Sequence, residues 1–338
     1  MLKEALLYKK LEDEKVSCYL CSHHCLILDG RFGICGVREN KEGTLFTHAY
    51  GSVIAAHIDP IEKKPLFHVM PGSMSFSIAA IGCNFRCGFC QNWQISQKQE
   101  AQNLGLVPQA MEPLEVVKLA RKAGCESISY TYTEPSIFFE YALEIAKLAK
   151  EQGLLNIFVT NGYMTKEALE MIKPYLDAAN VDLKFFKDDS YKKVCNARLF
   201  PVLESIKLMH AMGIWQEITT LVVPTLNDSQ GELEDIANFI ASVGIEMPWH
   251  ISRFHPDYKL IDNEPTSVTS LKLAESLGRK ANLRYVYLGN IPPEGENTYC
   301  YKCGKLLIKR FGFEVLEQRL KDSKCSYCQT KIEGLYLD

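Results

Sequence analysis

The sequence predicts an α/β fold in which strands of a parallel sheet alternate with helices from about residue 74 to about residue 290. Short runs rich in apolar and β-branched residues have the length of strands at residues 75–81, 127–132, 156–160, 180–185, 215–223, 249–254 and 285–288. Segments with the 3.6-residue periodicity of amphipathic helices lie between them, at residues 114–123, 137–150, 166–176, 202–212, 233–242 and 268–281. Units of this kind form a parallel sheet with right-handed crossovers, which either curls into a partial (β/α) barrel or stays open as a doubly wound sheet.

Three glycines support the predicted helix ends. Gly124, Gly153 and Gly213 follow helical segments at the positions where a left-handed residue commonly ends a helix. Because the carboxyl ends of parallel strands meet at one edge of a sheet, we expect the loops that follow the strands to carry the chemistry.

The chain divides by composition into three regions. Residues 1–70 are predicted to be a cysteine-rich metal-binding region, residues 71–290 the core, and residues 291–338 a small C-terminal zinc ribbon. The N-terminal residues 1–15 are expected to form a charged amphipathic helix. No run approaches the roughly 18 apolar residues of a membrane-spanning helix. Because the N-terminus also lacks the apolar stretch of a signal peptide, we expect a cytoplasmic protein.

Charges of both signs are mixed along the chain, with a net charge of −3. This balance argues against an extended basic surface for binding nucleic acids and against a basic terminal segment that would bind a membrane. Docking of an RNA or a protein through a local basic group, Lys305, Lys309 and Arg310, stays open.

The cysteines are the most informative residues. Thirteen are present, and all but Cys125 and Cys195 fall into three groups. Tight pairs and triples in a chain without an export signal favour metal or iron–sulfur ligation over disulfides. We expect the two remaining cysteines to be small buried side chains.

The central group has the spacing C-x3-C-x2-C and follows the first predicted strand of the alternating region. Cys83, Cys87 and Cys90 can hold three irons of a cubane cluster and leave the fourth iron open for a ligand. Phe85 and Phe89 can shield such a cluster from water. The alternatives are a chance triad, or a zinc site with His68 as fourth ligand.

This triad at the end of a strand resembles the signature of the radical SAM superfamily. The resemblance implies a radical SAM partial (β/α) barrel and a [4Fe-4S] cluster whose open iron binds S-adenosyl-L-methionine. It further implies a one-electron donor such as a flavodoxin or ferredoxin. Reductive cleavage would then give a 5′-deoxyadenosyl radical, which abstracts hydrogen from an unidentified substrate, of macromolecular or small-molecule type.

Other strand ends extend the resemblance to relatives of pyruvate formate-lyase activating enzymes. The string YTYTEP resembles the GGEP motif, although Tyr132 and Thr133 replace the two glycines. The cofactor contacts that the resemblance implies are Phe89, Glu134, Thr160, Asn161, Asp182, Lys184 and His255. Glu134 could instead cap the next helix, Asp182 and Lys184 could be a simple ion pair, and His255 could be structural. His250, Arg253 and His255 are expected to cluster after the sixth strand.

One subfamily fits more of the chain. The strings VTNGY, ANVDLKFF, PWHISRFHPDYK and GNIPPEGENTYC, together with both cysteine-rich flanks, resemble the radical SAM protein of the AmmeMemoRadiSam system. That resemblance implies association with Memo-type and AMMECR1-type proteins.

The two flanking groups each supply four thiols. Cys300-x2-Cys303 and Cys325-x2-Cys328, with a predicted hairpin between them, are typical of a structural zinc ribbon, with a rubredoxin-type iron as the alternative. Cys18, Cys21, Cys25 and Cys35 suit a structural zinc, an auxiliary iron–sulfur cluster or an unmetallated nest, and His23 and His24 offer further ligands. A rival hypothesis for the whole chain is a metal-organised scaffold, or a glycyl-radical activating partner, with little or no turnover.

Overall fold

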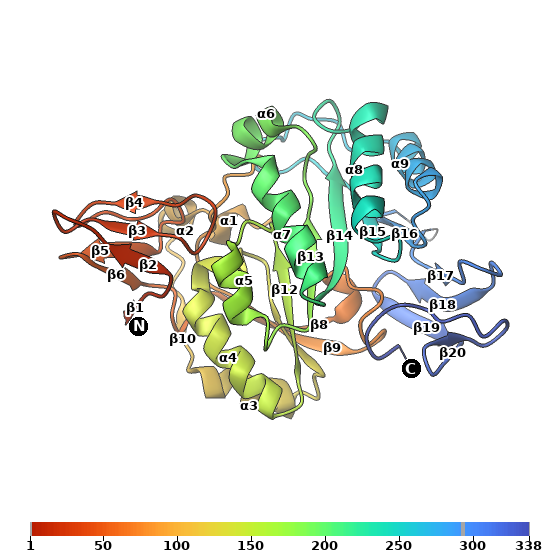
Figure 1. The fold of residues 1–338 in the computed structure, drawn as a ribbon, viewed down its shortest axis with the longest axis horizontal. Coiled ribbons are helices and arrows are strands. Elements are labelled where there is room, and N and C mark those ends of the chain that lie inside the picture. The colour runs from red at the N-terminus through yellow and green to blue at the C-terminus, as the bar shows by residue number, and fades with distance from the viewer. Residues whose placement is uncertain (1, 292–294, 338) are drawn as a thin grey trace.

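The computed structural model describes residues 2–291 and 295–337. The predicted string GNIPPEGENTYC therefore lies partly outside the described residues, at residues 292–294. The largest sheet among the described residues has eight strands in the order β16-β15-β14-β13-β12-β11-β9-β8 (Figure 1). These strands are β8 (Ala55–Pro60), β9 (Met74–Ala79), β11 (Ser127–Tyr130), β12 (Leu155–Thr160), β13 (Ala178–Asp182), β14 (Trp215–Val222), β15 (Trp249–Arg253) and β16 (Val286–Gly289).

The strand order decides between the two architectures. From β9 to β16 every strand of this sheet pairs in parallel with the sheet's next strand in chain order, and β8 adds an antiparallel edge beside β9. A doubly wound sheet reverses direction at a switch point, and this order does not. The seven predicted parallel strands and the partial (β/α) barrel are therefore confirmed.

The predicted helices are present and pack along the sheet, where their apolar faces are buried (Figure 1). They are α3 (Pro113–Lys122), α4 (Phe139–Glu151), α5 (Lys166–Ile172), α7 (Leu199–Ala211), α8 (Gln230–Val243) and α9 (Val268–Lys280). Three of them begin at hydroxyl caps, in which Thr165, Ser229 and Ser267 accept a hydrogen bond from a first-turn amide. Shorter helical turns are η1 (Ile61–Lys63), α1 (Trp93–Ser96), α2 (Lys98–Asn103), η2 (Pro135–Phe138), α6 (Asp188–Ser190) and the π-helical turn η3 (Tyr191–Cys195).

The helix predicted over residues 1–15 is wrong, because this segment forms strands. β1 (Lys3–Glu4) pairs with β6 (Thr44–Thr47), which also pairs with β5 (Arg38–Lys41). β2 (Tyr8–Lys10) belongs to a second small sheet with β3 (Val16–Cys18) and β4 (Leu26–Ile27). Leu7 has a φ of 58°, which a helix cannot contain. Pairing with strands distant in the sequence overrides a helical propensity that is only a weak preference.

The C-terminal region is a separate layer of short strands at the opposite end of the core from the N-terminal sheets (Figure 1). β18 (Leu306–Phe311) and β19 (Glu314–Gln318) form the predicted hairpin. β17 (Thr298–Tyr299) pairs with β18, and β20 (Leu320–Lys321) pairs with β21 (Lys324–Cys325). Its small core includes Leu307, Ile308 and Ile332 and closes on Phe67 and Tyr285 of the barrel.

The three-region division stays a prediction, and contacts cross its first boundary. β8 lies before residue 70 but pairs with β9 of the barrel sheet. β7 (Ser52–Val53) likewise pairs with β10 (Gln109–Ala110). Among the described residues, no helix has both the length and the apolar character needed to cross a bilayer.

Candidate functional site

The triad loop leaves the barrel sheet at the carboxyl end of β9. Two backbone hydrogen bonds hold it against η3, from Arg86 N to Cys195 O (2.8 Å) and from Gly88 N to Val194 O (3.2 Å). The Arg86 guanidinium also donates to the carbonyl of Cys83 within the loop, at 2.7 Å. These hydrogen bonds fix the triad loop to η3, the turn that comes after β13 in the chain.

The thiols of this loop lie in buried surroundings. Burial and the nearby Glu134 charge raise the pKa of Cys83, and burial raises the pKa of Cys90. Contact with the Cys195 thiol, at 3.4 Å between the two sulfurs, and burial raise the pKa of Cys87. Thiolates in such surroundings need a positive partner, which a metal cluster supplies. The donor set therefore fits an iron–sulfur cluster.

Glu134 connects the ends of two neighbouring strands. Its Oε1 accepts hydrogen bonds from Thr160 Oγ1 (2.8 Å) and Ser136 N (3.2 Å), and its Oε2 accepts one from Asn161 N (2.8 Å). The bond from Ser136 caps η2, as the capping alternative expects, and the contact of Glu134 with a cofactor stays a prediction. A carboxylate has about four acceptor positions, so one remains on Oε2 for a further donor. Burial raises the pKa of Glu134.

Asn84 joins this cluster to the triad. Its Oδ1 accepts from Asn161 Nδ2 at 2.8 Å, and its main-chain carbonyl lies 2.8 Å from His23 Nε2. Asn84 is fully buried, yet its Nδ2 has no partner among the described residues. A buried amide donor without a partner is costly, so a site for an acceptor group lies beside Cys83. Asn84 was not among the predicted site residues, because an asparagine between two cysteines is not part of a recognisable motif.

Asp182 and Lys184 lie at the end of β13, on the side of the triad. Lys184 Nζ pairs with Asp182 Oδ2 at 2.9 Å, as the ion-pair alternative expects, and the contact of either side chain with a cofactor stays a prediction. Burial lowers the pKa of Lys184, but the charges of Asp182 and Cys87 outweigh it and raise this pKa above its ordinary value. Lys184 Nζ also lies 5.8 Å from the ring centre of Phe89. The Lys184 ammonium group is therefore positively charged and lies near Cys87 of the triad.

The predicted cluster of His250, Arg253 and His255 does not form. His250 Nε2 contacts Glu217 Oε2 at 2.6 Å, Arg253 Nε donates to the carbonyl of Thr266 at 2.9 Å, and His255 is exposed. Successive strand residues point to opposite faces, and His255 already lies in the loop after β15. Its contact with a cofactor stays a prediction.

His68 does not join the triad either. Its Nδ1 lies 2.6 Å from the carbonyl of Glu333 and its Nε2 lies 2.7 Å from Tyr287 Oη, so both ring nitrogens are engaged with the C-terminal side of the molecule. The alternative of a zinc ion held by the triad and His68 is therefore wrong.

Cys195 is a further thiol at the triad, and it was not among the predicted site residues. It is fully buried, as predicted, but it belongs to η3 and its sulfur contacts Cys87. The two cysteines are 108 positions apart in the sequence, so no local spacing could have indicated the contact.

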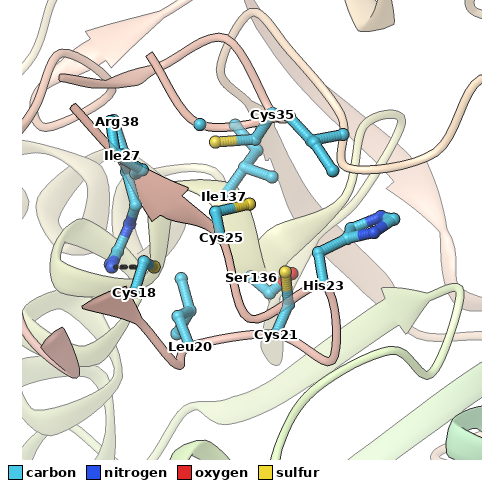
Figure 2. A pocket seen from close by; sticks show the side chains of 12 residues that line it. Cys18, Leu20, Cys21, His23, Cys25, Ile27, Cys35, Arg38, Ser136 and Ile137 are labelled. Carbon is cyan, nitrogen blue, oxygen red and sulfur yellow. Dashed lines mark hydrogen bonds between the residues drawn. The ribbon is translucent and has the colours of Figure 1, made fainter. Parts of the chain in front are cut away.

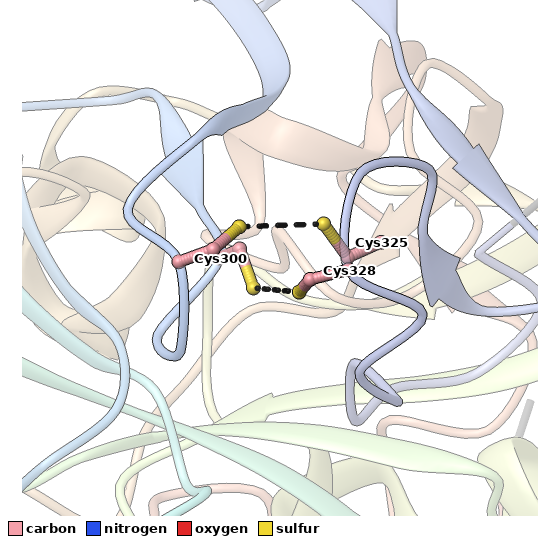
Figure 3. Close-up of side chains that lie close together, drawn as sticks. Cys300, Cys325 and Cys328 are labelled. Carbon is pink, nitrogen blue, oxygen red and sulfur yellow. Dashed lines mark hydrogen bonds between the residues drawn. The ribbon is translucent and has the colours of Figure 1, made fainter.

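The C-terminal quartet closes around one point (Figure 3). Cys300 and Cys328 have their sulfurs 3.6 Å apart, Cys303 and Cys325 have theirs 3.7 Å apart, and all four lie within 4.8 Å of one another. A tetrahedral zinc ion with Zn–S bonds of about 2.3 Å needs sulfur–sulfur edges of about 3.8 Å. Burial raises the pKa of Cys300 to about 12, whereas hydrogen bonds from Thr330 lower the pKa of Cys328 to about 6. The quartet fits one metal ion.

Arg310 is not available to an RNA or a protein partner. Its side chain is buried, lies 3.4 Å from Glu62 Oε1 and donates to the carbonyl of Phe67 at 2.8 Å. It ties β18 to the barrel, so the predicted basic docking group is reduced to the exposed Lys305 and Lys309.

The N-terminal quartet surrounds a cavity instead (Figure 2). Cys18 ends β3, Cys21 and Cys25 lie in the turn before β4, and Cys35 precedes β5. These three strands and the turn of η2 form the walls. Arg38 Nη1 lies 3.5 Å from the sulfur of Cys18.

Comparison with known proteins places this geometry in a family. The family model of the radical SAM superfamily matches residues 78–240. The uncharacterized protein MJ0808 of Methanocaldococcus jannaschii is 46% identical over 98% of this chain and 99% of its own length. The pyruvate formate-lyase-activating enzyme of Clostridium pasteurianum is 27% identical over 54% of this chain and 81% of its own length.

Solved structures share the fold. Streptococcus suis SuiB bound to its precursor peptide SuiA covers 69% of this chain and 52% of that chain, with a TM-score of 0.52 and 15% identity. A radical SAM methyltransferase from Sphaerobacter thermophilus covers 70% and 71%, with a TM-score of 0.50 and 16% identity. The chain therefore carries a radical SAM domain over residues 78–240 and is homologous to activating enzymes of the radical SAM superfamily.

Proposed function

We propose that Cys83, Cys87 and Cys90 hold the [4Fe-4S] cluster of this radical SAM enzyme and that the adjoining strand ends bind S-adenosylmethionine. The observation that carries the proposal is a chain of 2.8 Å hydrogen bonds that ends beside Cys83. Thr160 and the Asn161 amide donate to Glu134, and the Asn161 side chain donates to Asn84, the neighbour of Cys83. When bound, the cluster supplies the electron that splits S-adenosylmethionine into methionine and a 5′-deoxyadenosyl radical.

The side chains contribute binding and charge. The remaining acceptor position of Glu134 suits the amino group of the methionine moiety, and the unpartnered Nδ2 of Asn84 suits a carboxylate or a sulfide. Lys184, paired with Asp182, offsets the negative charge of the thiolates. Phe89 packs against Phe185, with ring centres 5.9 Å apart, and excludes water from the same corner. His255 is exposed in the loop after β15, and a contact with the cofactor remains part of the proposal.

The substrate class and partners form part of the same proposal. Homology to an enzyme named for activating pyruvate formate-lyase supports a macromolecular substrate. Radical SAM enzymes need an electron donor, and a flavodoxin or ferredoxin suits a one-electron step. The strings shared with the AmmeMemoRadiSam protein support Memo-type and AMMECR1-type partners. The C-terminal quartet is assigned a structural zinc ion, supported by its sulfur–sulfur distances of 3.6 and 3.7 Å.

The test is the formation of 5′-deoxyadenosine. Protein reconstituted without oxygen and reduced with dithionite should release 5′-deoxyadenosine from S-adenosylmethionine, and Cys87→Ala should reduce this product to background. Cys125→Ala is the matched control, because Cys125 is also buried but belongs to none of the three groups. Failure of the wild type to form product from an intact cluster would favour the scaffold hypothesis and overturn the proposal.

A further inference from the structure

The N-terminal quartet differs from a zinc site in the separation of its ligands. Among the described residues, the ligand atoms that gather as a candidate site for one metal ion are the four sulfurs of the C-terminal quartet, which lie within 4.8 Å of one another, and the N-terminal quartet does not form such a group. Zinc bonds of about 2.3 Å would draw four sulfurs to edges of about 3.8 Å. In a cubane each thiolate binds a different iron, so the sulfurs stand further apart around a larger object.

The sulfurs face a shared space. Cys18, Cys21, Cys25 and Cys35 all line one cavity, and Figure 2 shows the sulfurs of Cys21, Cys25 and Cys35 directed into it. The rest of the wall is largely aliphatic, from Leu20, Ile27, Ile34 and Ile137. An enclosed apolar wall around thiols keeps water from a metal cluster and makes the bare thiolates unfavourable.

His23 is not a competing ligand. Its Nε2 lies 2.8 Å from the carbonyl of Asn84, and its ring packs on Tyr163 at 4.9 Å between centres. Figure 2 shows the ring directed away from the sulfurs. Because a carbonyl oxygen only accepts, Nε2 carries a proton and donates to it. The ligand set of the cavity is therefore four cysteines.

A buried cation lies beside this set. Arg38 is 1% exposed, donates to the sulfur of Cys18 at 3.5 Å, and pairs with the buried carboxylate of Glu140. Donors to a ligating sulfur are among the means by which proteins tune iron–sulfur clusters.

We propose that Cys18, Cys21, Cys25 and Cys35 hold an auxiliary [4Fe-4S] cluster. With a cysteine for each iron the cluster has no open position, so it is not a second site for S-adenosylmethionine. It lies against the triad loop. Arg86 donates to the carbonyl of Ile34, and a β-carbon on Gly82 would lie 3.1 Å from the carbonyl oxygen of Cys35. The two sulfur sites are thus built on contacting loops.

Metal analysis of the unaltered protein gives the first test. Protein prepared without oxygen and with iron and sulfide in supply should contain about eight irons, about eight acid-labile sulfides and about one zinc per chain. A content of about four irons and two zincs would overturn the proposal. This measurement needs no variant, so it decides the question even where a substitution prevents folding.

Two variants locate the clusters. A chain with Cys83→Ala, Cys87→Ala and Cys90→Ala should keep about four irons, and the EPR signal of its reduced form should be unchanged by S-adenosylmethionine. A chain with Cys21→Ser and Cys25→Ser should keep a cluster whose signal changes on adding S-adenosylmethionine. Cys125→Ser should keep both. An iron-free triad variant that still binds zinc would refute the auxiliary cluster. A triad cluster indifferent to S-adenosylmethionine would instead refute the proposed function, so the two failures are distinguishable.

Discussion

The N-terminal and C-terminal regions each carry four cysteines, but they present them differently. In the C-terminal region two tight turns bring paired sulfurs to 3.6 and 3.7 Å, around a point that one ion can fill. In the N-terminal region the cysteines come from β3, the turn before β4 and the turn before β5, and they surround a cavity lined mainly by aliphatic side chains. The difference shows that the number of thiols does not define a metal site, because the backbone that carries them sets their separation.

The largest effect is expected from the C-terminal quartet. Cys325→Ser should abolish zinc binding and unfold residues 298–337, because metal binding supplies on the order of 10 kcal/mol to small domains of this kind. Zinc content and limited proteolysis measure the outcome, and the iron content should be unchanged. Loss of both zinc and iron would break the comparison, since the two regions would then depend on each other.

A smaller effect is expected from the cation at the N-terminal quartet. Arg38→Met should lower the free energy of unfolding by about 3–5 kcal/mol, because it leaves the buried carboxylate of Glu140 without its partner. Urea unfolding measures the loss. Lys3→Met is the matched control, since Lys3 also pairs with a glutamate of α4, Glu144, at 2.8 Å but in an exposed position, and should cost at most about 1 kcal/mol. Equal losses in the two variants would show that burial adds nothing to the effect of the Arg38–Glu140 pair.

The contact between the barrel and the C-terminal region should depend on pH. Burial lowers the pKa of His68 to about 4, below the value near 6.5 of an unfolded histidine. The unfolded state therefore binds more protons between pH 6.5 and pH 4, and stability falls as the pH is lowered through this window. We expect a loss of about 2 kcal/mol in the free energy of unfolding between pH 7 and pH 5. His68→Gln should show a shallower pH dependence in the same urea titrations, and an unchanged slope would assign the effect elsewhere.

The smallest effect concerns the contact between the N-terminal quartet and the triad loop. Gly82 has a φ of 116°, and an added β-carbon would lie 2.9 Å from Val37 Cγ1. Gly82→Ala should cost about 1–2 kcal/mol of stability, because the backbone conformation disfavours alanine and Val37 can move only in part. Thermal unfolding measures the cost. Gly105→Ala is the control, because its φ of 65° is also positive but no atom lies within 4 Å. A larger loss at Gly105 would show that packing against Val37 is unimportant.

The core of the fold could be read from the sequence because its signals are local. The strand ending at Thr160 and the helix beginning after Thr165 each follow from periodicity and a cap within a few residues. The N-terminal strands were missed for the opposite reason. Lys3 pairs with Thr47, and such a contact leaves no periodic pattern in a segment of two residues.

The candidate site was predictable to the same extent. Cysteines of the triad were found by spacing, and Glu134 by its place after a strand. The unpartnered amide of Asn84 and the contact between Cys87 and Cys195 could not be predicted. Both depend on loops from different βα units that meet at one edge of the sheet.

The sequence by itself determined the parallel βα architecture, the three cysteine groups and the resemblance to radical SAM enzymes, since each follows from residue types at short spacings. Only the tertiary structure decided how far apart the thiols of each group stand, which side chains neutralise them, and that the N-terminal group contacts the triad loop. Those properties arise from strands packed across long sequence separations, where the energy of burial rather than local preference selects the arrangement.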